Sequence, residues 1–190
     1  MLLRHPRVLI PGDAGAGNPR TPASRGTSIV ALGLAVLGLA CSAPDQPSGR
    51  GVPAPDIKVL SLSGDTVHLA SFRGTPVLLN LWATWCEPCK EETPYLESVA
   101  QKYAPQGLEV VGLSQDARGS DEAIAAFVKQ YGVSYTILHD PDMVAMERYA
   151  IVGLPTTLLL DREGIIRYVT IGPASTRDPG FEMTIKALLQ

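Results

Sequence analysis

The fold is decided by residues 80–90, which read Asn-Leu-Trp-Ala-Thr-Trp-Cys-Glu-Pro-Cys-Lys. They overlap the end of a nearly continuous apolar run over 76–82, which is typical of a central strand covered on both faces. A helical pattern follows over about 88–103. The two cysteines, Cys86 and Cys89, are therefore expected between a buried strand and the first turn of a helix.

Two thiols separated by two residues at a helix N-terminus can form a disulfide without unwinding the helix. The free N–H groups and the dipole there stabilise a thiolate on the first sulfur, which lowers its pKa from about 8.5. We therefore expect Cys86 to be an exposed nucleophile and Cys89, one turn inside, to be the resolving thiol. Pro88 suits the first helical turn and restricts the ring that the disulfide would close.

The sequence gives less support to two other interpretations of the cysteine pair. A zinc site needs two more ligands, and His68, His139 and the carboxylates show no paired metal-ligand spacing, so no metal is expected. A purely structural disulfide across two residues closes almost no chain, so its loop-entropy benefit would be small. A redox-active disulfide between Cys86 and Cys89, with no other cofactor, is the preferred interpretation.

The chain after residue 56 alternates strand and helix patterns. A turn signal at 63–65 joins strands expected at 57–62 and 66–70 into an N-terminal β-hairpin. Further strands are expected at 108–113, 135–138, 156–160 and 165–170, and helices at 120–131, 140–149 and 178–189. Alternating strands and helices that end in a hairpin and a helix predict an α/β sandwich with a mixed sheet.

Residues 80–90 resemble the active-site segment of the thioredoxin superfamily, and they are most similar to that of the membrane-anchored TlpA/ResA-like thiol–disulfide oxidoreductases. The resemblance extends from about residue 54 to the C-terminus. It includes Leu-Ala-Ser-Phe-Arg-Gly at 69–74, a helix–strand insert around 115–138 and Gly-Leu-Pro-Thr-Thr at 153–157. It implies a thioredoxin-like three-layer sandwich with a mixed central sheet, an N-terminal β-hairpin and this insert.

The resemblance also implies how a client protein would bind. Pro155 matches the family's cis-proline, which packs beside the disulfide. The peptide group before it, at Leu154, would pair with the client's backbone, which is a form of β-augmentation. Trp85 is expected at the rim of the site, and Glu87 and Pro88, which lie between the cysteines, complete the set of candidate client contacts.

A further candidate is the base that would deprotonate the resolving thiol. In thioredoxin a buried Asp handles this proton, but the matching position here holds Asn80, which cannot titrate. The ResA-like branch has a Glu three residues after the second cysteine, and Glu92 occupies that place. Since residues i and i+3 share a helix face, Glu92 can lie beneath Cys89. Burial would raise its pKa and make it a general base; a solvated helix carboxylate is the alternative.

Glu87 is expected to tune the redox potential. A carboxylate between the two thiols opposes thiolate formation and partly cancels the helix dipole. A less stabilised thiolate makes the dithiol less stable and lowers the potential. We therefore expect a reductant, with a potential nearer that of thioredoxin, about −270 mV, than that of the oxidant DsbA, about −120 mV.

Residues 1–40 have the pattern of an export signal. Four arginines and one acid precede an apolar run over 29–40, which is too short for a membrane-spanning helix of about 20 residues. Residues 37–41 resemble a lipoprotein lipobox, although that family prefers Leu where Gly38 stands. We expect cleavage before Cys41 and lipidation of this residue; an ordinary signal peptide is the alternative. Residues 41–55 are then a flexible Pro- and Gly-rich tether, and residues 56–190 form the thioredoxin-like domain.

Composition narrows the range of functions. With 190 residues and a formal net charge of −3, the chain lacks the basic character of nucleic-acid binders. The predicted function is that of an extracytoplasmic thiol–disulfide oxidoreductase, lipid-anchored on the periplasmic side of a membrane and monomeric. It would reduce disulfides of exported proteins and regain electrons from a membrane redox donor. Clients of the resembled family include apocytochrome c, but the sequence identifies no client.

Two alternatives belong to other functional classes. A peroxiredoxin-type peroxide reductase wants a Thr three residues before its reactive cysteine, where this chain has Ala83, with Thr84 one residue away. A copper chaperone of the Sco kind uses Cys-x-x-x-Cys with a distant His, and the cysteine spacing here is one residue shorter. Peroxide consumption and copper titration of the reduced protein distinguish both from a disulfide reductase.

Overall fold

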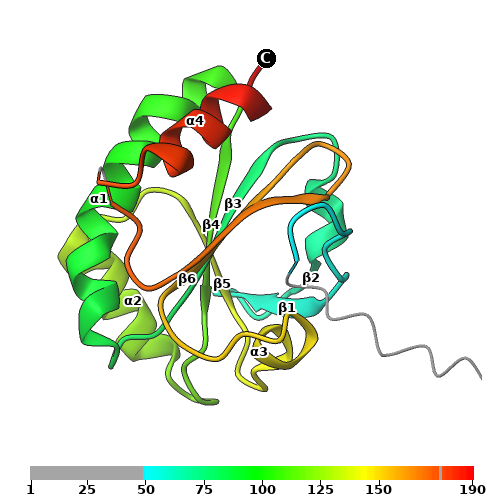
Figure 1. Cartoon of the computed structure of the whole chain (residues 1–190). Coiled ribbons are helices and arrows are strands. Elements are labelled where there is room, and N and C mark those ends of the chain that lie inside the picture. Colours follow the sequence, from blue (N-terminus) through cyan, green and yellow to red (C-terminus); the bar gives the residue numbers. More distant parts are fainter. Residues whose placement is uncertain (1–48, 176) are drawn as a thin grey trace, which may run out of the picture. The chain divides into compact units, whose positions relative to one another are not determined.

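The computed structural model describes residues 49–175 and 177–190 (Figure 1). Within them, seven strands form one mixed sheet in the order β2-β1-β5-β4-β3-β6-β7. The strands are β1 (Lys58–Ser61), β2 (Thr66–His68), β3 (Val77–Trp82), β4 (Glu109–Ser114), β5 (Thr136–His139), β6 (Thr156–Leu160) and β7 (Ile166–Ile171). The helices are α1 (Glu87–Tyr103), α2 (Asp121–Tyr131), α3 (Val144–Arg148) and α4 (Pro179–Leu188), with short 3-10 turns at Leu69–Phe72 and Ala104–Gln106.

The central strand is β3, and all six of its residues are buried, as its apolar run predicts. It is parallel to β4 and antiparallel to β6, while β4 is in turn parallel to β5. The outer strands β1, β2 and β7 pair antiparallel with their neighbours. Because β3 and β4 are parallel, both strands end on the same side of the sheet. The chain leaves the C-terminal end of β3 there and continues to the cysteines.

Helices cover both faces of this sheet. Successive side chains of a strand point to opposite faces, so β3 contributes to two cores. Leu78 packs with Leu96 of α1 and Phe181 of α4, whereas Leu79 packs with Tyr149 on the other face. Figure 1 shows α1, α2 and α4 on one side of the sheet and α3 on the other, with the β1–β2 hairpin forming one edge of the sheet. The predicted thioredoxin-like three-layer sandwich is confirmed.

Most elements begin and end within two residues of their predicted bounds, but the helix predicted over 140–149 starts later. The α3 helix begins at Val144, after a turn in which the Met143 N–H donates to the Asp140 carbonyl at 3.0 Å. The Asp140 carboxylate still caps this helix, because it accepts the Val144 and Ala145 N–H groups at 3.0 and 2.7 Å. Asp140 thus caps the helix from before the turn, and the predicted start of the helix was wrong by the length of this turn.

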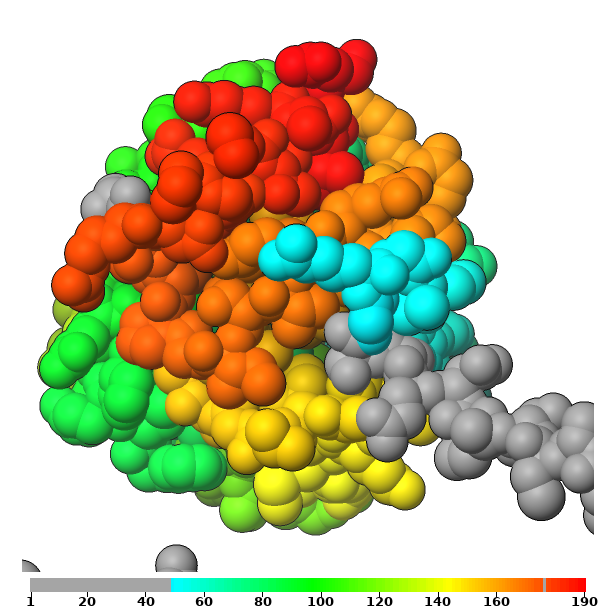
Figure 2. All heavy atoms as spheres, viewed as in Figure 1, coloured from blue at the N-terminus to red at the C-terminus, as the bar shows by residue number. Residues whose placement is uncertain are grey.

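The N-terminal boundary of the folded domain also differs from the prediction. Of the tether predicted over 41–55, residues 51–54 pair with the start of β7, across which they lie in Figure 2. Gly51 N–H donates to the Ile166 carbonyl at 2.7 Å, and Ala54 N–H donates to the Gly164 carbonyl at 2.8 Å. This stretch therefore belongs to the domain rather than to a free tether.

The predicted signal segment, the predicted lipidation site Cys41 and the first part of the predicted tether lie outside the described residues. None of the helices in the described part of the chain has the length and hydropathy that a membrane span requires.

Candidate active site

The two cysteines lie where β3 leads into α1, and they form a disulfide with a Cα–Cα distance of 5.2 Å. Cys86 is the N-cap residue of α1, and its sulfur accepts the Cys89 N–H at 3.3 Å. Pro88 stands in the first turn, as expected. The sulfur of Cys86 therefore lies at the positive end of the helix dipole, where a thiolate is stabilised.

The prediction that Cys86 is exposed was wrong for this oxidised state. Only 5% of Cys86 and 1% of Cys89 are exposed. Both pack in an apolar cluster with Trp82 and with Ile124 and Phe127 of α2. Trp82 is thus both a core residue and a wall of the site. The two cysteines still differ, because Cys86 reaches the surface through a groove that Cys89 does not line.

This groove has a volume of about 480 Å³ and is largely apolar. Its lining includes four of the five residues proposed from the sequence to contact a client: Trp85, Glu87, Pro88 and Leu154. Sequence reasoning missed the other residues of the lining, which are Gln115, Met143, Met146, Val152 and Gly153. The large apolar side chains of Trp85, Met143 and Val152 are exposed here, so the groove offers a surface for an extended peptide beside the disulfide.

The Leu154–Pro155 peptide bond is cis, as the resemblance implies. The Pro155 carbonyl accepts the Gly172 N–H at 2.8 Å, and the Thr156 hydroxyl donates to the Gly153 carbonyl at 2.7 Å. Leu154 lies between Gly153 and Pro155. Neither its N–H nor its C=O forms a hydrogen bond with any part of the chain that the structure describes. The backbone of Leu154 is therefore unpaired within the described chain, which is compatible with the client pairing that the resemblance implies.

Glu92 lies on α1 three residues after Cys89 and is 2% exposed. Its carboxylate accepts the Ala174 N–H at 2.7 Å, the Asn80 side-chain amide at 3.2 Å and the Thr157 hydroxyl at 3.4 Å. Burial raises the pKa of Glu92 to about 7, although these three hydrogen bonds oppose the rise. The alternative of a solvated helix carboxylate is therefore wrong, and Glu92 can exchange a proton near neutral pH.

Glu87 behaves differently from this buried acid. Its side chain is 74% exposed and pairs with the Lys90 ammonium at 2.8 Å. The hydrogen bond from Lys90 to Glu87 raises the pKa of the Lys90 side chain. Part of the negative charge between the cysteines is thus balanced by a cation that the sequence analysis did not take into account.

Asp116, which the sequence analysis did not select, lies beside the cysteine loop. It follows β4 and is buried, and its carboxylate accepts both the N–H and the hydroxyl of Thr84 at 3.0 and 2.6 Å. One signal could have identified it: the polar run 114–116 begins at the last residue of β4, a buried strand parallel to β3. Polar groups at the C-terminal ends of neighbouring parallel strands meet at one edge.

The histidines considered as metal ligands have structural partners instead. His139 contacts the Asp116 carbonyl at 2.9 Å and the Asp121 carboxylate at 3.2 Å, and His68 contacts the Asp56 carboxylate at 3.0 Å. Within residues 49–175 and 177–190, no three His, Cys, Asp or Glu side chains are grouped so that they could hold a metal ion.

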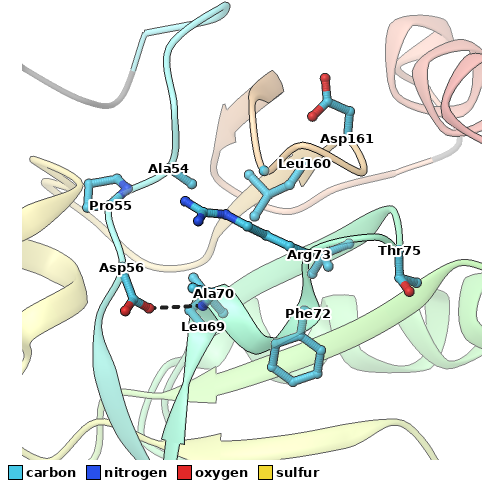
Figure 3. Close-up of a pocket in the computed structure, with 12 residues that line it drawn as sticks. Ala54, Pro55, Asp56, Leu69, Ala70, Phe72, Arg73, Thr75, Leu160 and Asp161 are labelled. Atoms are coloured by element: carbon cyan, nitrogen blue, oxygen red, sulfur yellow. Dashed lines mark hydrogen bonds between the residues drawn. The ribbon is translucent and has the colours of Figure 1, made fainter.

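A second pocket lies at the opposite end of β3, where the docked N-terminal segment, the Leu69–Phe72 turn and the end of β6 meet (Figure 3). Arg73 extends across it, and the Asp56 carboxylate accepts the Ala70 N–H at 2.9 Å. This pocket contains no cysteine and does not adjoin the disulfide.

Comparisons with known proteins agree with this geometry. Residues 50–169 match the family model described as the AhpC/TSA family. The thiol-disulfide oxidoreductase ResA of Bacillus subtilis (strain 168) is 34% identical over 143 residues, which cover 75% of this chain and 78% of ResA. The ResA of Bacillus thuringiensis subsp. konkukian (strain 97-27) is 38% identical over 114 residues, or 60% of this chain and 65% of that protein, so this match spans less than two thirds of the relative.

Solved structures give the same result. A crystal structure from Chlorobium tepidum, described as that of a thiol:disulfide interchange protein DsbE, aligns with a TM-score of 0.68 at 30% identity, over 75% of this chain and 99% of that chain. The resemblance inferred from residues 80–90 is thereby confirmed over the whole folded domain. The chain belongs to the AhpC/TSA family, as a thioredoxin-fold member of the group that includes the ResA thiol-disulfide oxidoreductases.

Proposed function

We propose that this protein is an extracytoplasmic thiol–disulfide oxidoreductase that reduces disulfides of exported proteins. One observation carries the proposal. The Cys86–Cys89 disulfide caps the N-terminus of α1 and meets an apolar groove beside the unpaired peptide group of Leu154. A reactive sulfur, a helix dipole and a free backbone edge are the three parts that exchange with a peptide disulfide requires.

The reaction runs in two exchanges. In the reduced protein the Cys86 thiolate attacks one sulfur of the client disulfide, and the other client sulfur leaves as a thiolate. The Cys89 thiolate then attacks the Cys86 sulfur, the protein disulfide forms, and the second client thiolate leaves. The client gains two electrons and the Cys86–Cys89 dithiol loses two. A membrane redox donor would return two electrons to the protein and begin the next cycle.

Glu92 is the proposed base for the second exchange. Its pKa of about 7 allows it to be deprotonated in a useful fraction of molecules and to accept the proton of the Cys89 thiol. Asn80 donates to the Glu92 carboxylate and cannot itself titrate. Proton transfer from Cys89 therefore depends on the helix carboxylate rather than on a strand acid.

Client binding would use the groove and the backbone beside it. The N–H and C=O of Leu154 would pair with the client's main chain, held in place by Pro155. Trp85 and Pro88 would contact the side chains next to the client cysteine, because both line the groove at its reactive end. No nucleic acid is involved, and one copy of the chain contains the whole site.

We place the protein on the periplasmic side of a membrane, held by a lipid on Cys41. The support is the arginine-containing leader, the short apolar run and the cysteine that follows it. Apocytochrome c, whose cysteines must be reduced before haem attachment, is the proposed client. Substitution of Cys41 by Ser should abolish incorporation of labelled fatty acid and release the protein from the membrane fraction; retention of both would overturn the anchor.

The activity is tested by trapping. A Cys89→Ala protein should accumulate a Cys86–client disulfide on non-reducing gels, and a Cys86→Ala, Cys89→Ala control should form none. The reduced native protein should also reduce insulin disulfides, whereas Cys86→Ala should not. Failure of the native protein to reduce insulin, together with no trapped adduct, would overturn the proposal. Peroxide consumption that matches the disulfide rate would instead favour the peroxide-reductase alternative.

A further inference from the structure

Asp116 is a buried carboxylate with no part in the exchange reactions described above. It is 2% exposed. Besides the N–H and hydroxyl of Thr84, it accepts the Ser114 hydroxyl at 2.7 Å. None of the ion pairs in the described residues involves this carboxylate. The hydrogen-bond donors to this carboxylate are therefore neutral groups, two of which belong to one residue of the cysteine loop.

Thr84 lies two residues before the nucleophile. The loop leaves β3 after Trp82 and closes a turn in which the Cys86 N–H donates to the Ala83 carbonyl at 3.1 Å. Cys86 then caps α1, and its sulfur accepts the Cys89 N–H. The hydrogen bonds from Thr84 to Asp116 thus fix the loop at the point from which the chain turns into the helix.

We propose that Asp116 is a positioning residue that holds the Thr84 loop so that the Cys86 sulfur keeps its place at the N-terminus of α1. Hydrogen bonds to an ionised acceptor are short and strong, which suits a fixed anchor. The helix dipole falls off within the first turn, so a sulfur that moves away loses stabilisation of its thiolate. The rate of attack also depends steeply on the geometry of the reacting atoms.

Another buried carboxylate, outside the proposed site, supplies a matched control. Glu97 of α1 accepts the N–H and the hydroxyl of Ser134 at 2.8 and 2.6 Å. This is the same pair of donors, again from one residue, that Asp116 takes from Thr84. Ser134 lies outside the cysteine loop. Loss of the Glu97 bonds should therefore lower the stability of the fold without changing Cys86.

A role in positioning and a purely electrostatic role predict opposite results. Removal of a negative charge near a thiol favours the thiolate and lowers the pKa of that thiol. Release of the loop weakens the contact of Cys86 with the helix N-terminus, which raises the pKa of the Cys86 thiol. The direction of the change in an Asp116→Asn protein distinguishes the two roles.

The experiment compares Asp116→Asn, Thr84→Val, Thr84→Ser and Glu97→Gln, each in the reduced full-length protein. Thiolate absorbance against pH gives the pKa of Cys86, an aromatic disulfide reagent gives its rate of attack, and urea unfolding gives stability. We expect Asp116→Asn and Thr84→Val to raise the pKa by about one unit and to slow attack about tenfold. Thr84→Ser, which keeps the hydroxyl, should behave as the native protein, and Glu97→Gln should change stability alone.

A lowered or unchanged Cys86 pKa in folded Asp116→Asn and Thr84→Val would overturn the inference. An equal rise in Glu97→Gln would also overturn it, because the effect would then be one of general destabilisation. If Asp116→Asn does not fold, Thr84→Val decides alone. The inference rests on the proposed function, in which Cys86 is the nucleophile. The Cys86 pKa, its rate of attack on the reagent and the stability are nevertheless all measured without a client. Failure of every protein to reduce insulin would therefore count against the proposed function only.

Discussion

Two buried carboxylates flank the cysteines, and they differ in what holds them. Glu92 on α1 and Asp116 after β4 are each only 2% exposed. The donors to Glu92 come from three distant segments: Ala174 at 2.7 Å, Asn80 at 3.2 Å and Thr157 at 3.4 Å. With one short bond and two long ones, burial dominates and raises the pKa of Glu92 to about 7.

Asp116 takes its donors from only two residues, Thr84 and Ser114, at distances of 2.6, 2.7 and 3.0 Å. Two of the three belong to Thr84, in the loop that carries Cys86. Equal burial therefore accompanies two different sets of donors, and the two proposed roles differ in the same way: Glu92 would move a proton, and Asp116 would hold the backbone of the Thr84 loop. The hydrogen-bond donors around each carboxylate, rather than its degree of burial, distinguish Glu92 from Asp116.

Among substitutions that test this comparison, Glu92→Gln should have the largest effect, and that effect is on the rate of the second exchange. Glutamine keeps an acceptor for the Ala174 N–H but cannot take a proton. The second exchange, attack by Cys89 on the mixed disulfide, should slow about 10²- to 10⁴-fold at pH 7, which is the usual contribution of general base catalysis. The first attack, by Cys86, should proceed at the native rate. Samples quenched with acid and run on non-reducing gels would show the mixed disulfide accumulating.

The same measurement on the Asp116→Asn protein should give the opposite result to Glu92→Gln. Its first exchange should be slowed, and its second exchange should proceed near the native rate. If both substitutions slow the same step, the two carboxylates do not have separate tasks.

The next largest expected effect is the change in the free energy of unfolding with pH that Glu92 causes. The pKa of Glu92 is about 7 in the folded protein, against a usual value of 4.5. Between these values the folded protein keeps a proton that the unfolded chain has released, so the free energy of unfolding falls as the pH rises. The loss is up to about 3 kcal/mol and is complete above pH 7. Urea unfolding from pH 4.5 to 8 measures it, and Glu92→Gln should lack this loss.

Glu97 provides an internal check with the opposite sign. Burial would raise its pKa, but the hydrogen bonds from Ser134 outweigh burial and hold the pKa below its usual value of 4.5. Its contribution to stability is present above pH 4.5 and is lost as the pH falls. A native protein whose stability rises between pH 4.5 and 7 would contradict the assignment for Glu92.

Asn80→Ala should have an intermediate effect. The Asn80 amide donates to both Glu92 and Thr157, at 3.2 and 2.9 Å. Its loss removes one of the bonds that oppose the rise in the Glu92 pKa, so that pKa should increase further. Stability should fall by about 1–3 kcal/mol, because buried polar groups lose their partner. Carboxyl chemical shifts of labelled Glu against pH would measure the pKa, and a decrease would contradict the predicted sign.

The sequence predicts much of this site because the motif is local. The strand before the cysteines, the helix after them and the spacing of Glu92 from Cys89 all lie within one continuous stretch, 76–103. The cis-proline could be predicted only from the resemblance, since few X-Pro bonds are cis. Local spacing thus identified the reactive groups but not their surroundings.

The contacts that sequence reasoning missed join residues far apart in the chain. Thr84 and Asp116 meet because β3 and β4 are parallel neighbours, and Ala174 reaches Glu92 from a loop that carries no motif. The burial of Cys86 depends on α2, whose Phe127 covers Trp82 at a ring distance of 4.4 Å. Such contacts follow from packing, which neither composition nor periodicity specifies.

The smallest effect is expected from Glu87→Gln. Because this carboxylate is 74% exposed and already paired with Lys90 at 2.8 Å, solvent and the ammonium screen it from Cys86. The pKa of the Cys86 thiol should fall by only a few tenths, which corresponds to a rise of about 10 mV in the potential. Equilibration with glutathione measures both proteins. A rise of about 30 mV or more would show that the surface charge, rather than the interior carboxylates, sets the reducing character of the site.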